Sequence, residues 1–175
     1  TTFGQGVSNT AIQIASLYQT LGNGGVRLPV SLVSGCRAAD GTMTEVPDAT
    51  GEQIVPANVS TDVVNMLETV VTGGYARTSL EIPGYRVGGK TGPAQAPSAE
   101  GGYDGHTASF VGAAPIEDPE IVVSVVVQRP TDGYYGGTAA APLFQQVMAH
   151  SLRSLGVPPS AEDPDVYPRE ADDDQ

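Results

Sequence analysis

The chain has 175 residues, 39% of them hydrophobic, with 22 glycines and 14 prolines, which predicts one loop-rich domain or part of one. Its net charge of -12, with 8 basic residues against 20 acidic ones, argues against a nucleic-acid partner and against an anionic membrane surface. Cys36 is the only cysteine, so no internal disulfide can form, and no apolar run is long enough to cross a membrane.

The first half of the chain predicts two helices separated by a hairpin. The first helix follows a capping residue at Ser8 or Asn9 and ends near Asn23, in a run of glycines. Asp40-Gly41 is a strong two-residue hairpin signal that joins two extended segments, Val26–Ala39 and Thr42–Val46.

The second helix is expected over about Asp62–Thr72, with Ser60 or Thr61 as its cap and Gly73-Gly74 as its end. The apolar residues of this segment predict that one helix face is buried, made of Val63, Met66, Leu67 and Val70.

The second half predicts strands followed by a helix. An extended segment around Lys90 leads into a loop at Ala96–Gly105, and two further strands follow at His106–Ala113 and Ile121–Gln128. The valine-rich third strand predicts burial on both faces. The last helix is expected over Thr138–Leu155, with an apolar face of Leu143, Val147, Leu152 and Leu155. Together these elements predict an α+β fold, an antiparallel sheet with helices packed on it.

The segment Lys90-Thr91-Gly92-Pro93 is the main candidate site, and it holds the only lysine of the chain. A lysine supplies positive charge for a carboxylate, and the threonine hydroxyl can donate a hydrogen bond to it. The glycine allows a ligand to lie close to the backbone. The tripeptide alone is a weak signal, and a solvated lysine at a strand end is the alternative.

Several further landmarks occur in the order typical of one family. Up to about Pro159, the chain resembles the C-terminal part of a class B penicillin-binding protein transpeptidase domain. The landmarks are Phe3–Gly6, Leu21–Gly25, Ile82–Gly92, Ala108–Gly112 and Tyr134–Gly137. The resemblance implies an incomplete penicillin-binding/β-lactamase-like domain over residues 1–159. Residues 160–175 are rich in acidic residues and predict a disordered tail.

Of the three motifs that the family uses, only Lys-Thr-Gly is present. The residue three before Lys90 is Val87, so the chain contains no Ser-x-x-Lys, and no serine has an asparagine two residues later. The resemblance therefore implies that the nucleophilic serine lies upstream, that this chain contains no catalytic residue and is inactive alone, and that a membrane anchor also precedes it.

The family's reaction is the cross-linking of peptidoglycan stem peptides through an acyl-serine, at the extracytoplasmic face of the bacterial membrane. The resemblance implies that Lys90 and Thr91 bind the carboxylate of the stem peptide or of a β-lactam, and that Gly92 lines the groove. It implies no cofactor and no metal.

Pro93 departs from the family, which usually has threonine there, with a hydroxyl for the carboxylate and a backbone N–H for the oxyanion hole. Proline offers neither group. A non-catalytic module that binds peptidoglycan peptide or a division protein is therefore an alternative, and a β-lactamase-type hydrolase is another. The Phe3–Gly6 and Tyr134–Gly137 landmarks favour the transpeptidase group over the hydrolase.

Other conspicuous residues have simpler interpretations. His106 is interpreted as a loop or strand-end residue, because the family's base is a lysine. Three arginines are interpreted as surface charges: Arg77, Arg86 and Arg129. Of these, Arg86 could have a carboxylate partner. Tyr134 and Tyr135 are expected to pack where the sheet meets the helix.

In the family, the strand Ile121–Gln128 pairs with an upstream strand, so a free edge here predicts homo-association or pairing with the upstream part.

Overall fold

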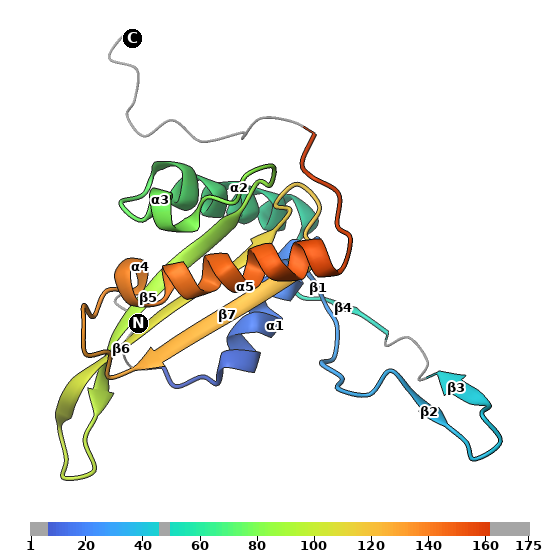
Figure 1. Ribbon diagram of the computed structural model, residues 1–175, viewed down its shortest axis with the longest axis horizontal. Coiled ribbons are helices and arrows are strands. Elements are labelled where there is room, and N and C mark those ends of the chain that lie inside the picture. Colours follow the sequence, from blue (N-terminus) through green and yellow to red (C-terminus); the bar gives the residue numbers. More distant parts are fainter. Residues whose placement is uncertain (1–6, 46–49, 162–175) are drawn as a thin grey trace, which may run out of the picture.

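The computed structural model describes residues 7–45 and 50–161 (Figure 1). Three long strands form its antiparallel sheet in the order β5 (Gly88–Pro97), β6 (Tyr103–Ala114) and β7 (Ile121–Gln128). Helices pack on this sheet, which confirms the predicted α+β architecture. The Phe3–Gly6 landmark, the end of the second hairpin segment at Val46 and the acidic tail from residue 162 onward lie outside the described residues.

The sheet is covered on both faces. Helix α5 (Ala141–Ser154) lies across one face, and α1 (Ala11–Gly22) lies behind the sheet (Figure 1). Helix α2 (Ala57–Gly73) packs against β5 and α1, while two short helices, α3 (Arg77–Leu80) and α4 (Gly136–Ala139), contact α5. The core between the sheet and α5 centres on Phe110 and Phe144, which are fully buried with ring centroids 4.6 Å apart.

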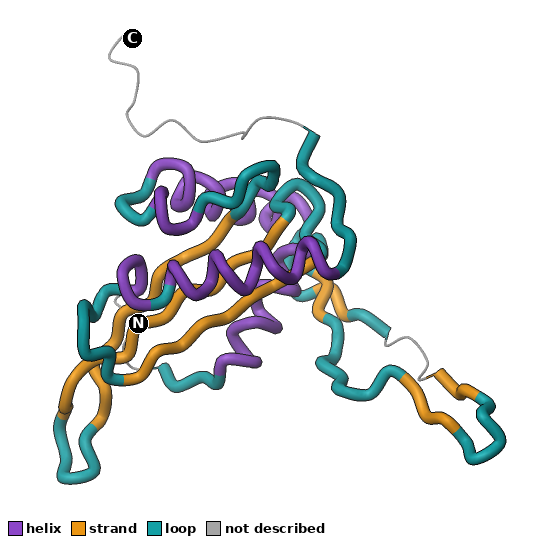
Figure 2. The backbone as a smooth tube through the Cα atoms, in the orientation of Figure 1, coloured by secondary structure: helices purple, strands orange, loops and turns teal. Residues whose placement is uncertain are grey.

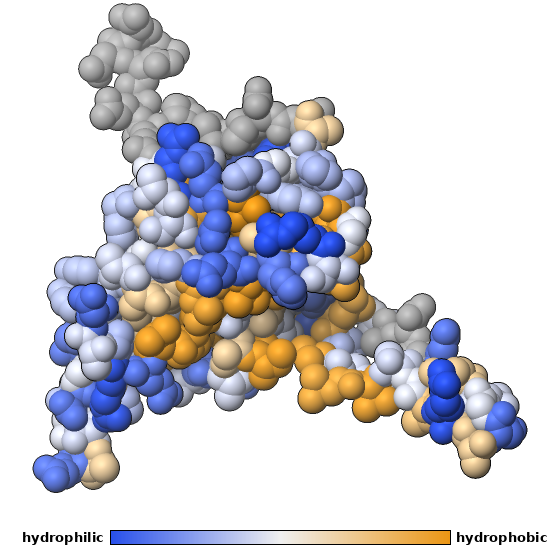
Figure 3. All heavy atoms as spheres, viewed as in Figure 1, coloured by the Kyte–Doolittle hydropathy of each residue, from blue (hydrophilic) through white to orange (hydrophobic). Residues whose placement is uncertain are grey.

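The predicted hairpin forms an arm that projects from the body (Figure 2). Strands β2 (Gly35–Arg37) and β3 (Met43–Glu45) pair around a turn that contains Asp40-Gly41, as expected, but the connection is longer than the predicted two residues because Arg37 pairs with Met43 and the Ala38 N–H donates to the Thr42 carbonyl. The long first strand is wrong, because β1 (Val26–Arg27) ends just before the Leu28-Pro29 step and pairs with β4 (Glu52–Gln53) instead. Proline lacks the N–H that a strand needs to continue its ladder. Exposed apolar side chains gather along the arm and beneath the body (Figure 3).

Helix α1 begins one or two residues later than predicted, because Thr10 is its N-cap. The Thr10 hydroxyl accepts a hydrogen bond from the Gln13 N–H, and the Gln13 side chain accepts one from the Thr10 N–H, which makes a capping box. Two apolar residues of α1, Ile12 and Leu17, are more than half exposed.

Helix α2 starts five residues earlier than predicted, after Pro56. Ser60 does not cap it, because its hydroxyl donates to the Leu21 carbonyl of α1 at 2.5 Å from a fully buried position. The predicted buried face is wrong, and Met66 is 54% exposed. The residues that face the sheet and α1 are Ser60, Val64, Glu68 and Val71.

The second half of the chain differs from the prediction mainly in the faces that are buried. Strands β5 and β6 extend beyond the predicted bounds into one long hairpin. Strand β7 has the predicted bounds, but only Val125 is buried and Val126 is 40% exposed, so burial on both faces is wrong. On the last helix only Leu152 of the predicted face is buried, while Leu143, Val147 and Leu155 are exposed. No helix in the described part of the chain is both long and apolar enough to span a membrane.

Candidate functional site

The Lys-Thr-Gly segment lies on β5, at the edge of the sheet. Within residues 7–45 and 50–161, β5 pairs only with β6, with Lys90 opposite Val111 and Thr91 opposite Phe110. Lys90 is exposed, and Thr91, Gly92 and Pro93 are half-buried. The outer edge of the strand is therefore open beside these four residues. A free strand edge is the usual place for an extended peptide to bind through its backbone.

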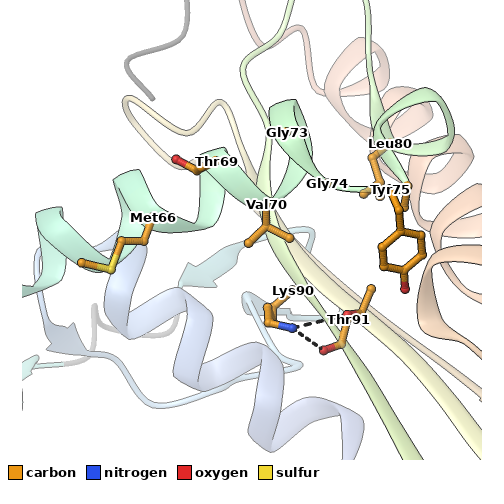
Figure 4. Close-up of a pocket in the computed structure, with 10 residues that line it drawn as sticks. Met66, Thr69, Val70, Gly73, Gly74, Tyr75, Leu80, Lys90 and Thr91 are labelled. Atoms are coloured by element: carbon orange, nitrogen blue, oxygen red, sulfur yellow. Dashed lines mark hydrogen bonds between the residues drawn. The ribbon is translucent and has the colours of Figure 1, made fainter. Parts of the chain in front are cut away.

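The Lys90 ammonium and the Thr91 hydroxyl lie next to each other. Lys90 Nζ is 3.3 Å from the Thr91 carbonyl oxygen and 3.4 Å from Thr91 Oγ1 (Figure 4). Among the described residues, no carboxylate forms a salt bridge with Lys90. A positive charge beside a hydroxyl, without an acidic neighbour, suits an anionic ligand such as a carboxylate.

A cavity of about 270 Å³ lies between α2 and β5, and Lys90 and Thr91 form one side of it. Its other walls are largely apolar and include Val70 of α2, Leu80 of α3 and the Tyr75 ring (Figure 4). Lys90 is the one charged residue among those described that line this cavity. An apolar cavity with a few convergent polar groups is typical of a ligand site.

The start of β5 is held tightly against α2. A Cβ on Gly88 would lie 2.5 Å from Ile116 Cδ1 and 3.2 Å from the Glu68 backbone nitrogen, so the close approach requires glycine there. Two residues before Gly88, the Arg86 guanidinium binds Glu68 with Nε–Oε1 at 2.8 Å and Nη2–Oε2 at 2.6 Å. The Glu68 side chain is fully buried and that of Arg86 is 10% exposed.

This ion pair corrects the interpretation of Arg86 as a surface charge, although its possible carboxylate partner was correctly anticipated. The interpretation of the other two arginines is confirmed. Arg77 pairs with Glu81 at the surface, and Arg129 is exposed while it donates to backbone carbonyls of the β5–β6 hairpin, at Asp104 and Pro97. Sequence reasoning missed Glu68, because a glutamate in a helix is ordinarily solvent-exposed.

Gly92 and Pro93 sit where β5 meets the middle of β6. The Ser109 hydroxyl donates to the Gly92 carbonyl at 2.7 Å, and Pro93 lies opposite Ala108. Since side chains alternate along a strand, Thr91 and Pro93 share one face of the sheet. Ser109 is a site residue that was not identified from the sequence, although it lies within the Ala108–Gly112 landmark.

His106, Tyr134 and Tyr135 form an aromatic cluster at the surface, in which His106 is half-buried and both tyrosines are exposed. The His106 and Tyr134 rings stack with centroids 4.4 Å apart, and Tyr134 Oη donates to Tyr135 Oη at 2.9 Å. This hydrogen bond raises the pKa of Tyr134. Tyr134 stacks on His106 of β6 and Tyr135 is the N-cap residue of α4, so both lie where the sheet meets the helix, as expected, although they remain 42% and 50% exposed. His106 lies within β6, opposite Gln95.

Comparison with known proteins identifies the family. A family model for the penicillin binding protein transpeptidase domain matches residues 1–149. The probable peptidoglycan D,D-transpeptidase PbpC of Pseudomonas aeruginosa is 35% identical over 90% of this chain and 26% of its own length. The peptidoglycan D,D-transpeptidase FtsI of Escherichia coli is 34% identical over 91% of this chain and 26% of its own.

Solved structures agree with this result. Penicillin binding protein 3 of Mycobacterium tuberculosis, in a crystal structure with ampicillin, has a TM-score of 0.79 and 33% identity over 93% of this chain and 39% of its own. The chain spans 26% of the length of the curated relatives named above. The fold, the order of the landmarks within the described residues and these matches agree: the chain is part of a transpeptidase domain and belongs to the penicillin-binding protein family.

Proposed function

We propose that this chain is the part of a peptidoglycan D,D-transpeptidase that binds the carboxylate of the substrate. Lys90 and Thr91 hold that carboxylate, while Gly92 and Pro93 line the groove along the open edge of β5. One observation carries this assignment. The Lys90 ammonium lies beside the Thr91 hydroxyl at 3.4 Å, without a salt-bridge partner among the described residues, on the wall of a largely apolar cavity.

The reaction requires a serine from the upstream part of the full-length protein. Its oxygen attacks the carbonyl carbon between the two terminal D-alanines of a stem peptide, the C–N bond breaks, and D-alanine leaves with the proton on its amine. An amine from a second stem peptide then takes the acyl group and releases the serine. Peptidoglycan lies outside the cytoplasmic membrane, so the site works at the extracytoplasmic face.

Penicillins are expected to acylate the same serine when their lactam ring opens. The M. tuberculosis relative, which was crystallised with ampicillin, supports a β-lactam as a ligand of this site. The carboxylate of a penicillin would then occupy the position that the stem-peptide carboxylate takes, between Lys90 and Thr91.

Pro93 favours a second candidate function, a non-catalytic module that binds peptidoglycan peptide or a division protein. Proline cannot supply a hydroxyl or a backbone N–H at a position where the family usually has threonine. The carboxylate site on Lys90 and Thr91 would serve either function, so acylation of the full-length protein separates the two.

The test is labelling of the full-length protein with fluorescent penicillin, followed by denaturing electrophoresis. Lys90→Ala should lower the labelling rate by about tenfold or more, because a hydrogen bond to a charged group contributes roughly 1.5–3 kcal/mol. Arg37→Ala is the matched control, since Arg37 is an exposed cation on the arm, far from β5 in sequence. Equal labelling of wild type and Lys90→Ala would remove the proposed role of this site.

A further inference from the structure

Tyr75 has the exposure and the position of a ligand-contacting residue. It follows the end of α2 in the stretch Gly73-Gly74-Tyr75, is 72% exposed and lines the same cavity as Lys90 and Thr91. Its hydroxyl makes no hydrogen bond with any other residue in the described ranges. A tyrosine with a free hydroxyl at the mouth of a cavity is a residue type that often dominates binding.

The ring is nevertheless held in place from one side. A Cβ at Gly137 would lie 2.5 Å from Tyr75 Cε2 and 2.9 Å from Cζ, so the ring rests directly on this glycine. A ring that is already restrained loses little conformational entropy when a ligand contacts it. The contact with Gly137 therefore holds the Tyr75 ring in position at the side of the cavity before a ligand binds.

The neighbouring glycine, Gly136, contacts Thr91 in the same way. A Cβ at Gly136 would lie 3.1 Å from Thr91 Cβ, so the consecutive glycines Gly136 and Gly137 bring Thr91 and Tyr75 side by side. In Figure 4 the Tyr75 ring hangs from the loop after α2 toward Thr91, with its hydroxyl at the lower end. Any larger residue at either glycine would push one of the two side chains away.

We infer that Tyr75 contacts the carboxylate-bearing ligand of the Lys90–Thr91 site and contributes to its affinity. The ring would cover the apolar part of the ligand next to the carboxylate, and the hydroxyl would donate to one of its oxygens. The O–H of Tyr75 matters more here because Pro93 supplies none on the face of β5 that carries Thr91. This inference rests on the proposed function, which supplies the ligand class, a D-Ala-D-Ala stem peptide or a penicillin.

The experiment measures penicillin acylation of the full-length protein over a range of concentrations, which separates the half-saturating concentration from the limiting rate. The variants are Tyr75→Ala, which removes the ring, and Tyr75→Phe, which removes only the hydroxyl. Tyr103→Ala is the matched control, because Tyr103 is 63% exposed at the far end of the β5–β6 hairpin and does not line the cavity.

Tyr75→Ala should raise the half-saturating concentration at least about fivefold while the limiting rate changes little. Tyr75→Phe should raise it by about threefold, as expected for one lost hydrogen bond. The control should match wild type, and the melting temperatures of all three variants should stay at the wild-type value.

An unchanged half-saturating concentration in Tyr75→Ala would overturn the inference, and so would a lowered melting temperature with unchanged saturation, which would give Tyr75 a purely structural role. Lys90→Ala, measured in parallel, distinguishes a failure of the inference about Tyr75 from a failure of the proposed function. If Lys90→Ala loses affinity and Tyr75→Ala does not, the inference fails alone. If Lys90→Ala behaves like wild type, the proposed function fails and the inference fails with it.

Discussion

Glu68 and Arg86 form a two-pronged ion pair that is almost completely removed from water, with N–O distances of 2.8 Å and 2.6 Å. The pair joins α2 to the chain just before β5, four residues from Lys90. Two further contacts hold the Arg86 backbone, because its N–H donates to Ser160 Oγ and its carbonyl accepts from the Ile116 N–H. The ion pair thus fixes where the Lys-Thr-Gly strand begins.

We expect Glu68→Gln to destabilise the transpeptidase domain by about 3–5 kcal/mol, because it leaves the Arg86 charge buried without its partner. The double variant Glu68→Leu, Arg86→Met removes both charges and should recover most of the loss. Urea unfolding measures both effects, with Arg77→Met as a control at an exposed pair. A Glu68→Gln variant as stable as wild type would mean that the pair does not fix α2 to β5.

The 175-residue chain on its own should not be acylated, since it contains neither Ser-x-x-Lys nor Ser-x-Asn. Incubation with fluorescent penicillin and denaturing electrophoresis should show no labelled band, while a full-length protein treated in parallel should be labelled. A covalent band on the isolated chain would show that a nucleophile lies within it.

The outer edge of β7 should recruit another strand. Within the described residues β7 pairs only with β6, and apolar side chains lie exposed on it and on α5, at Val126, Leu143 and Val147. An unpaired apolar edge is a template for association. We expect the isolated chain to dimerise or aggregate in light scattering, and Val126→Lys to reduce this association. A chain that stays monomeric at high concentration would argue against a reactive edge.

Pro93 should slow acylation of the full-length protein. Loss of one oxyanion-hole donor costs roughly 10²–10³ in rate, and proline has no N–H to donate. The fold tolerates this residue, because Pro93 lies on an edge strand of the described sheet. Pro93→Thr is therefore expected to raise the second-order rate of penicillin acylation at least about tenfold. Equal rates in both proteins would mean that a neighbouring N–H or a water replaces the donor, and would weaken the non-catalytic alternative.

The sequence predicted the elements better than their buried faces. The order of the helices and strands, the position of the hairpin turn and the bounds of β7 could be predicted from local signals such as Asp40-Gly41 and the valine run. Such signals depend only on residues that are close in the sequence. The faces of α2 and α5 were wrong because each segment has apolar residues on more than one side, and tertiary contacts decide which side faces the sheet. On α2 the buried row even includes the charged Glu68, whose partner Arg86 lies 18 residues away.

The candidate site shows the same limit. Lys90 and Thr91 could be identified because Lys-Thr-Gly is a local sequence motif, and the family resemblance assigned it a role in carboxylate binding. Tyr75 and the glycines Gly136 and Gly137 could not be connected to it, because they come together only through contacts between distant segments of the chain.

A crystal structure of the full-length protein after reaction with ampicillin would test the central claim most directly. We expect an acyl-serine supplied by the upstream part, with the ligand carboxylate about 2.7–3.0 Å from Thr91 Oγ1 and near Lys90 Nζ, a charge-assisted hydrogen-bond distance. A carboxylate bound elsewhere, with the outer edge of β5 unoccupied, would contradict it.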